Sequence, residues 1–195
     1  MMLKNTVAGV FRPDERTLAR LYDVIVVIGG SLLVGLSAQI RIYLPFSPVP
    51  ITGQTFAVLM IGALLGSRRG GLAMFVYLVE GTLGLPVFAS GVGFTALLGP
   101  AGGYLVGFMP AAYLVGWLAE RGWDRRVLTT IAAMIIGDAV LLTFGFVWLA
   151  ALTNIRTAFL TGVCPFILGD FLKVAIAAAV FPAGWKLLTR LNIKN

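Results

Sequence analysis

Asp170 and Lys173 place a carboxylate and an ammonium group beside a long apolar run, residues 174–185. Residues three apart share one face of a helix, so the two side chains can contact each other or a common ligand. A charge within a bilayer is costly and usually faces a cavity on a substrate path. The pattern favours a binding site. The alternative is a mutually neutralised pair, or Asp170 as a helix N-cap with Lys173 extending outward.

The composition indicates an integral membrane protein. Hydrophobic residues make up 59% and charged residues 12% of the 195 residues, far from the balance of a soluble domain. The absence of histidine excludes His-based catalytic triads and metal sites, and the one cysteine, Cys164, excludes an intrachain disulfide. We expect neither a cofactor nor a metal. The net charge of +7 is explained by membrane topology rather than by a nucleic-acid partner.

The apolar runs predict an all-α membrane protein with six transmembrane helices. They lie at about 22–44, 52–66, 70–83, 103–119, 129–152 and 165–188. We expect residues 1–20 to form a cytoplasmic amino-terminal segment, residues 21–190 the six-helix substrate-binding domain, and residues 191–195 a cytoplasmic tail. The second and third runs are short enough to be re-entrant or strongly tilted.

The basic residues predict that both termini are cytoplasmic. With the amino terminus inside, the outer segments hold only Arg41 and Arg156, and Lys173 lies in the sixth run. The inner segments hold Lys4, Arg12, Arg16, Arg20, Arg68, Arg69, Arg121, Arg125, Arg126, Lys186, Arg190 and Lys194. This asymmetry fixes the orientation by the positive-inside rule.

Three unusual segments then fall on the outer side. Residues 45–50 hold three prolines and must form a rigid extended loop. Residues 81–107 hold eight of the 24 glycines, so the backbone there adopts unusual conformations or approaches another group closely. The third segment is 165–173. Their convergence on one face predicts a binding site there, and we expect the two loops to close over a bound ligand.

Four ordered motifs carry a family resemblance. They are Ser47-Pro-Val-Pro-Ile-Thr52 with Gln54-Thr55, Gly84-Leu-Pro-Val-Phe-Ala89, Gly99-Pro-Ala-Gly-Gly-Tyr104, and Pro165-Phe-x-x-Gly-Asp-x-x-Lys173. In this order and spacing they resemble the BioY family of biotin transporters. The resemblance implies the substrate-binding S component of an energy-coupling-factor (ECF) transporter in the bacterial cell membrane. Its partners would be a transmembrane coupling protein and two cytoplasmic ATPases.

Biotin's chemistry suggests roles for the polar residues. Asp170 can accept a ureido N–H, and Lys173 can bind either the ureido oxygen or the carboxylate. The complete set of candidate substrate-binding residues is Asp170, Lys173, Thr52, Gln54, Tyr77, Glu80, Phe88, Gly91 and Phe94. The aromatic residues could instead contact lipid or other helices. The glycine run 89–94 departs from the family, which often has a polar or basic residue there, so that residue's role as a ligand is not carried over to this chain.

Two acidic residues have open roles. Glu80 either reaches the pocket or lies in water at the membrane interface. Asp138, midway along the fifth run, is either a second polar contact or a residue packed between helices. A proton-coupled carrier would use such a residue, but no second mid-membrane acid with a plausible partner accompanies it.

The chain has no P-loop sequence, so it must bind substrate while partners supply energy, or facilitate uptake unaided. We therefore expect a binding subunit and not an enzyme. The alternatives are an S component for another vitamin and a small intramembrane enzyme that uses Asp170 and Glu80 as acid and base.

A stripe of small residues on the first helix suggests a partner surface. Ser31, Gly35 and Ala38 recur at intervals of four and three, which lets another helix approach closely in lipid. From the spacing alone, packing within the chain's own fold is the slightly favoured alternative. The resemblance favours docking on the coupling protein.

Overall fold

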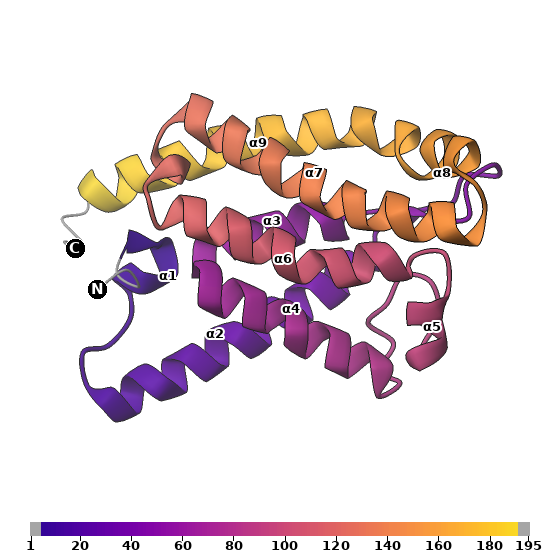
Figure 1. The fold of residues 1–195 in the computed structure, drawn as a ribbon. Coiled ribbons are helices and arrows are strands. Elements are labelled where there is room, and N and C mark those ends of the chain that lie inside the picture. Colours follow the sequence, from indigo (N-terminus) through magenta and orange to yellow (C-terminus); the bar gives the residue numbers. More distant parts are fainter. Residues whose placement is uncertain (1–4, 191–195) are drawn as a thin grey trace.

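The computed structural model describes residues 5–190, apart from the side chain of residue 168, and shows a helical bundle (Figure 1). Its principal helices are α2 (Arg16–Ser37), α3 (Gln54–Leu65), α4 (Ser67–Thr82), α6 (Gly102–Ala119), α7 (Val127–Leu152) and α9 (Cys164–Arg190). The predicted cytoplasmic tail, together with Lys4 and Lys194, lies outside the described residues. The helical fold class is confirmed by these elements.

Short elements close the two ends of the bundle (Figure 1). One end, here the hairpin end, carries β1 (Arg41–Ile42), β2 (Ile51–Thr52), α5 (Phe94–Leu98) and α8 (Ile155–Gly162). The opposite end, here the terminal end, carries α1 (Val7–Val10), the 3₁₀ turn η2 (Trp123–Arg125) and the end of α9. Both ends of the described chain lie at the terminal end.

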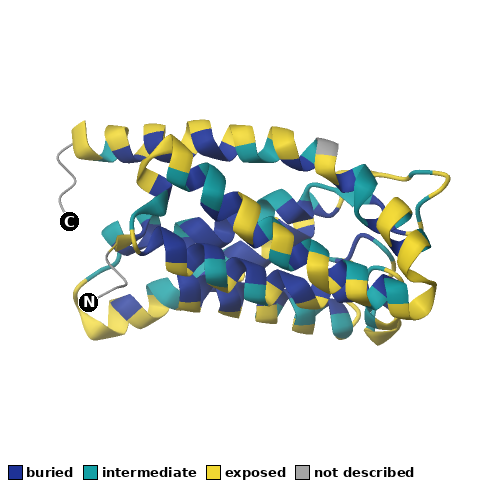
Figure 2. Cartoon of the chain, turned by 45° about the horizontal axis from the view of Figure 1, so that its top comes forward, coloured by how far each residue is buried: buried dark blue, intermediate teal, exposed yellow. Residues whose placement is uncertain are grey.

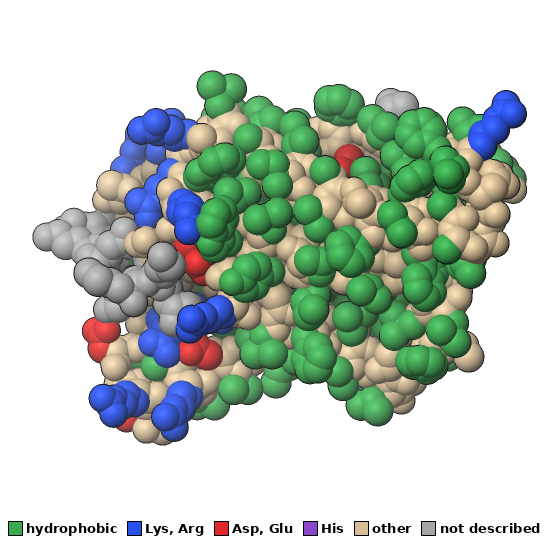
Figure 3. Space-filling view, in the orientation of Figure 1, with side chains coloured by type: hydrophobic (Ala, Val, Ile, Leu, Met, Phe, Trp, Pro, Cys, Tyr) green, Lys and Arg blue, Asp and Glu red, His purple; other side chains and the backbone are tan. Residues whose placement is uncertain are grey.

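Four helical stretches are long and apolar enough to cross a membrane within the described part of the chain. They are Arg16–Ser37, Gly102–Ala119, Val127–Leu152 and the stretch Ile155–Arg190 that contains α8 and α9; α3 is apolar but shorter. The bundle surface agrees with a lipid environment. Large apolar side chains are exposed along the helices, while Lys and Arg gather at the terminal end (Figures 2 and 3).

Helix α6 is the centre of the bundle and packs against α3, α4 and α7. Small residues let its neighbours approach closely. A Cβ at Gly62 of α3 would lie 2.5 Å from the carbonyl oxygen of Ala112, and one at Gly103 would lie 2.5 Å from that of Phe144. Because lipid provides no hydrophobic force between helices, such close packing is the main source of association.

The first predicted run was too long at its far end. Helix α2 ends at Ser37, and the chain then turns into β1, which pairs antiparallel with β2 in the register Arg41↔Thr52 and Ile42↔Ile51. The Pro-rich segment 45–50 is therefore the loop of a short hairpin. The segment after α7, expected as a loop, contains helix α8, whose N-cap Asn154 accepts a hydrogen bond from the main-chain N–H of Thr157.

Candidate functional site

A charged cluster lies near the start of α9. The ammonium of Lys173 donates to Oδ1 of Asp170 at 2.8 Å and to the hydroxyl of Thr55, on α3, at 2.6 Å. The predicted contact between Asp170 and Lys173 is therefore present. Thr55 was not singled out as a ligand, because a threonine at the start of an apolar helix gives no distinctive signal in sequence.

The second carboxylate oxygen of Asp170 has no partner. Asp170 is 6% exposed, and its Oδ2 is buried without a hydrogen bond. An acceptor in this state costs free energy unless a ligand or water donates to it. Lys173 holds the other oxygen, and Asp138 of α7 lies within hydrogen-bonding range of Asp170, so this acceptor lies beside both a cation and a second carboxyl group.

Asp138 of α7 lies beside this cluster. It lines a small cavity together with Thr55, Asp170 and Lys173. It also lines a groove between α7 and α9 on the outside of the bundle, again with Asp170. Asp138, the acidic residue of the fifth predicted run, therefore lies next to Asp170 and Lys173.

A cavity at the hairpin end adjoins the cluster through Thr55. Its empty volume, including the open space at its mouth, is about 410 Å³. The lining is mostly apolar and comes from the hairpin, α3, the Gly-rich segment, α6 and α9: Val49, Pro50, Thr52, Gln54, Thr55, Phe88, Ala89, Ser90, Ala101, Tyr104, Leu105, Phe108 and Phe166.

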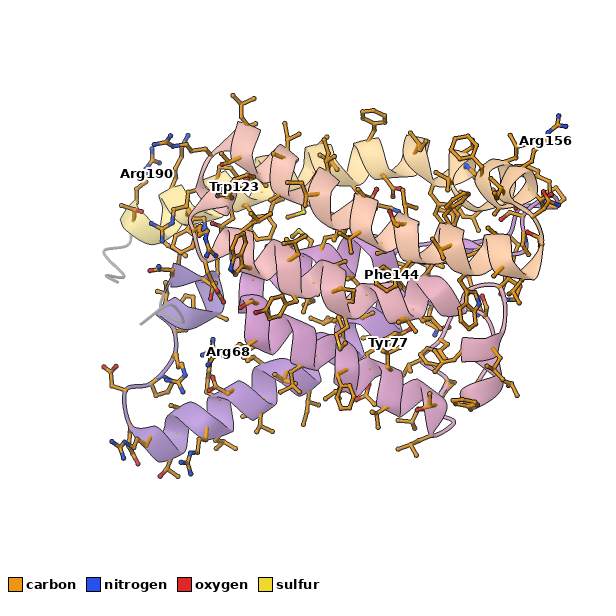
Figure 4. All side chains as sticks on the ribbon, in the orientation of Figure 1. Arg68, Tyr77, Trp123, Phe144, Arg156 and Arg190 are labelled. Carbon is orange, nitrogen blue, oxygen red and sulfur yellow. The ribbon has the colours of Figure 1, made fainter. Side chains whose placement is uncertain are left out.

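Three of the predicted residues, Thr52, Gln54 and Phe88, line this cavity. The Thr52 hydroxyl donates to Oε1 of Gln54 at 3.3 Å, and the Gln54 amide donates to the hydroxyl of Tyr77. Tyr77 is fully buried behind them and donates to the carbonyl oxygen of Val87 at 3.2 Å. Its ring meets Phe88 edge-on, with the ring centroids 5.3 Å apart. Tyr77, labelled in Figure 4, thus supports the lining residues from α4.

The other predicted residues lie outside the cavity lining. Glu80 accepts a hydrogen bond from the Ser31 hydroxyl at 3.0 Å, which joins α4 to α2. Phe94 is 63% exposed at the start of α5. Gly91 forms a turn with a φ of 99°, a conformation that L side chains rarely adopt, between the lining residue Ser90 and Phe94.

The cavity lining also contains polar and aromatic residues that were not among the candidate substrate-binding residues. Ser90 has a buried hydroxyl oxygen without a partner. Tyr104 stacks on Phe166 with the ring centroids 5.7 Å apart and donates to the carbonyl oxygen of Gly162 at 2.5 Å. Tyr104 ended one motif and Phe166 lay in another, so their positions were visible although their orientation was not.

Arg41 joins the hairpin to the Gly-rich segment. Its guanidinium donates to the carbonyl oxygen of Ala89 at 2.7 Å, and the Tyr43 hydroxyl approaches the same oxygen at 3.4 Å. Ala89 lines the cavity. This contact holds the two loops predicted to cover the ligand against each other.

The stripe of small residues on α2 faces inward. Ser31 and Ala38 are 0% exposed, and a Cβ at Gly35 would lie 3.1 Å from the side chain of Val87. The stripe therefore packs against α4 and the segment before the cavity. The exposed face of α2 instead carries large apolar residues, including Val24, Ile28 and Leu36.

The lipid-facing helices, the cavity and the buried carboxylate oxygen are together typical of a membrane protein with a candidate small-molecule site. Residues 12–190 match the model of the BioY family. The chain belongs to the BioY family.

Named relatives cover most of the chain. It is 37% identical over 164 residues to "Biotin transporter BioY" of Rhizobium etli, covering 80% of this chain and 88% of the relative. It is 38% identical over 149 residues to "Probable biotin transporter BioY" of Pyrococcus horikoshii, covering 76% and 86%. The fold resembles the crystal structure of the S-component for biotin from an ECF-type ABC transporter, with a TM-score of 0.75, 23% identity, and coverage of 89% and 95%.

Proposed function

We propose that this protein captures biotin from outside the cell and delivers it inward as the S component of an ECF transporter. The observation that carries the proposal is the unpartnered Oδ2 of Asp170, buried beside Lys173 and next to a cavity in a BioY-family chain. The names of the relatives support biotin as the ligand and transport as the role.

In the proposed complex the ureido ring lies at the charged cluster. Oδ2 of Asp170 accepts a ureido N–H, and Lys173 contributes its charge to the ureido oxygen or to the carboxylate of the tail. Thr52 and Gln54 provide neutral hydrogen bonds, and Phe88 covers the apolar thiophane ring and tail. Tyr77, Glu80, Gly91 and Phe94 act on the ligand indirectly, through the positions of the helices and loops that hold them.

In the proposed topology the six principal helices span the cell membrane. The terminal end of the bundle lies on the cytoplasmic side. Arg68, Trp123 and Arg190 lie at that end and Arg156 lies at the opposite end (Figure 4), a distribution that supports the orientation. The hairpin end, with its cavity, then faces outward. A transmembrane coupling protein and two cytoplasmic ATPases are the proposed source of energy, because the sequence contains no P-loop.

The small-residue stripe can serve as a docking surface only if α2 moves, because the stripe is occupied by the chain's own α4 and by Val87. The exposed apolar face of α2 is therefore our preferred docking surface for the coupling protein. In lipid, such a face needs close shape complementarity to hold a partner.

The direct test is to purify the protein from membranes of cells grown with biotin and to identify small molecules in the denatured eluate by mass spectrometry. We expect biotin in an amount equimolar with the protein. Asp170→Asn should lose it, whereas Asp124→Asn, the same change at a buried acid of the terminal end, should retain it. A different vitamin would reassign the substrate, and turnover of the ligand to a product would favour the intramembrane enzyme.

A further inference from the structure

A second apolar depression lies on the outside of the bundle between α4 and α6, apart from the biotin cavity. Its empty volume is about 970 Å³, and its lining residues are Arg68, Gly71, Leu72, Phe75, Met109, Pro110 and Tyr113. We refer to these residues as the α4–α6 groove. Leu72 and Phe75 are 51% and 52% exposed along it, so an apolar occupant would cover side chains that the chain leaves open.

The groove exists because Gly71 leaves the surface of α4 without a side chain beside Tyr113. A Cβ at Gly71 would lie 3.5 Å from Cδ2 of Tyr113, an ordinary contact distance. A Cβ at residue 71 is therefore tolerated, and the rest of a larger side chain would occupy space in the groove. This gives a way to close the groove without altering its charge.

The terminal end of the groove is positively charged. Arg68 is exposed, lies at the start of α4 (Figure 4), and makes no ion pair within residues 5–190. A hydrogen bond of 2.8 Å from the main-chain N–H of Ser67 to Glu120 joins the start of α4 to the end of α6. Arg121, the residue after Glu120, is thereby held close to the same end.

Arg121 lies just beyond the end of α6 and contacts Trp117. Its guanidinium lies 3.3 Å from the ring centroid of Trp117 and donates to the carbonyl oxygen of that residue. Trp117 follows Tyr113 by one helical turn, so both rings lie on the same face of α6. The groove lining thus contains Arg68 and Tyr113, and Trp117 and Arg121 follow Tyr113 toward the terminal end.

We propose that the α4–α6 groove binds an anionic phospholipid of the leaflet at the terminal end. The headgroup phosphate would pair with Arg68 and Arg121, and one acyl chain would lie against Leu72, Phe75 and Met109. Charge complementarity selects this occupant: a basic pocket between helices, at the basic end of a membrane protein, is the arrangement that recognises anionic headgroups. An apolar helix of a partner would use the trough but leave both arginines without counter-charges.

The test uses the purified full chain and two phospholipids with the same acyl chains, phosphatidylglycerol and phosphatidylcholine. Native mass spectrometry should show that the wild type retains phosphatidylglycerol in preference to phosphatidylcholine. Arg68→Gln should lower retention of phosphatidylglycerol about fivefold, since one basic residue near an anionic surface contributes about 1 kcal/mol. Arg68→Gln/Arg121→Gln should abolish the preference. Arg126→Gln, an exposed arginine at the start of α7, is the matched control and should keep it.

Gly71→Leu distinguishes lipid binding in the groove from lipid binding to the basic residues alone. It should reduce retention of phosphatidylglycerol with both arginines in place, while thermal melting in detergent stays close to that of the wild type. Equal retention of both lipids by the wild type, or an Arg126→Gln effect as large as that of Arg68→Gln, would overturn the anionic site. Unchanged retention in a folded Gly71→Leu variant would overturn the acyl-chain groove. Neither result bears on biotin capture.

Discussion

At the hairpin end, polar side chains surround a cavity, whereas at the terminal end they join one part of the chain to another. Asp170 and Ser90 each keep a buried oxygen without a partner beside the hairpin-end cavity. At the terminal end, Asp23 pairs with both Arg12 and Arg69, at 2.9 and 2.8 Å. A buried oxygen without a partner also occurs at the terminal end, on Asp124, so what sets Asp170 and Ser90 apart is the cavities that they adjoin.

The backbone shows the same contrast. At the hairpin end, the chain between helices forms a hairpin and a Gly-rich loop with positive φ angles at Gly84, Gly91 and Gly93. At the terminal end, α3 and α4 are joined through Gly66 alone, and α6 presses directly on this junction through Gly116. Gly66 and Gly122 at the terminal end also have positive φ angles, so the two ends differ in the length and packing of their connections.

The largest expected effect is a loss of stability at the junction between α3 and α4. A Cβ at Gly116 would lie 2.4 Å from the main-chain carbon of Gly66 and the nitrogen of Ser67, so Gly116→Val must displace backbone. We expect a loss of stability of about 3 kcal/mol or more, seen as a lower melting temperature in detergent. Gly29→Val, on α2 with nothing within 4 Å, is the control. Equal melting of both variants would show that the junction is not a close contact.

The next effect concerns biotin affinity at the candidate site and leaves the stability of the terminal end unchanged. Asp170→Asn and Lys173→Met should each weaken biotin binding by about 1.5–3 kcal/mol, the range for a hydrogen bond to a charged group. Titration calorimetry in detergent measures it, and melting temperatures without ligand establish that both variants are folded. Unchanged affinity in both would remove the pair from the proposed binding site.

A third effect should appear as a pH dependence of the terminal end. Asp124 is 2% exposed, and burial raises its pKa to about 6, although Trp185 donates to its Oδ2 at 2.6 Å. A raised pKa means that the folded state favours the protonated acid. Stability should therefore fall as the pH rises from about 4 to 6, by on the order of 2 kcal/mol.

Asp124→Asn tests this cause, because it removes the titrating group and retains an acceptor for Trp185. Melting temperatures across this pH range should vary less in the variant than in the wild type. The same slope in both proteins would place the pH dependence elsewhere.

The smallest expected effect tests whether the contact between the loops at the hairpin end restrains the ligand. Arg41→Gln removes the guanidinium contact to Ala89 and should loosen the loops over the cavity. A hydrogen bond worth about 1 kcal/mol corresponds to roughly fivefold faster biotin dissociation. Arg156→Gln, an exposed arginine at the same end, is the control. Dissociation at the wild-type rate in Arg41→Gln would show that this contact does not restrain the ligand.

Sequence patterns predicted those features that depend on local spacing. The interval between Asp170 and Lys173 placed them on one face of a helix, and the structure joins them directly. The apolar runs located the principal helices, because a bilayer requires long, internally bonded segments. The prolines of 45–50 excluded helix, and that segment is the loop of a hairpin.

Features that depend on tertiary packing could not be predicted in this way. The spacing of Ser31, Gly35 and Ala38 showed a surface suited to close approach, but whether the approaching group belongs to the same chain is not encoded in one helix. Phe88 and Phe94 looked alike as loop aromatics; Phe88 is 3% exposed in the cavity and Phe94 is 63% exposed. Thr55 acquires its role only because α9 brings Lys173 to it.

Helix α9 connects the charged cluster of Asp170 and Lys173 to the terminal end. Asp170 lies near its start and Trp185, bonded to Asp124, near its end, about 15 residues or about 22 Å of helix apart. Pro182 lies within the helix and removes one main-chain hydrogen bond close to that anchor. Bending stiffness is thus lowest beside the fixed end. A bend of α9 at this point would shift Asp170 and Lys173, the proposed ligands of the substrate, relative to Trp185 and would strain the bond between Lys173 and Thr55.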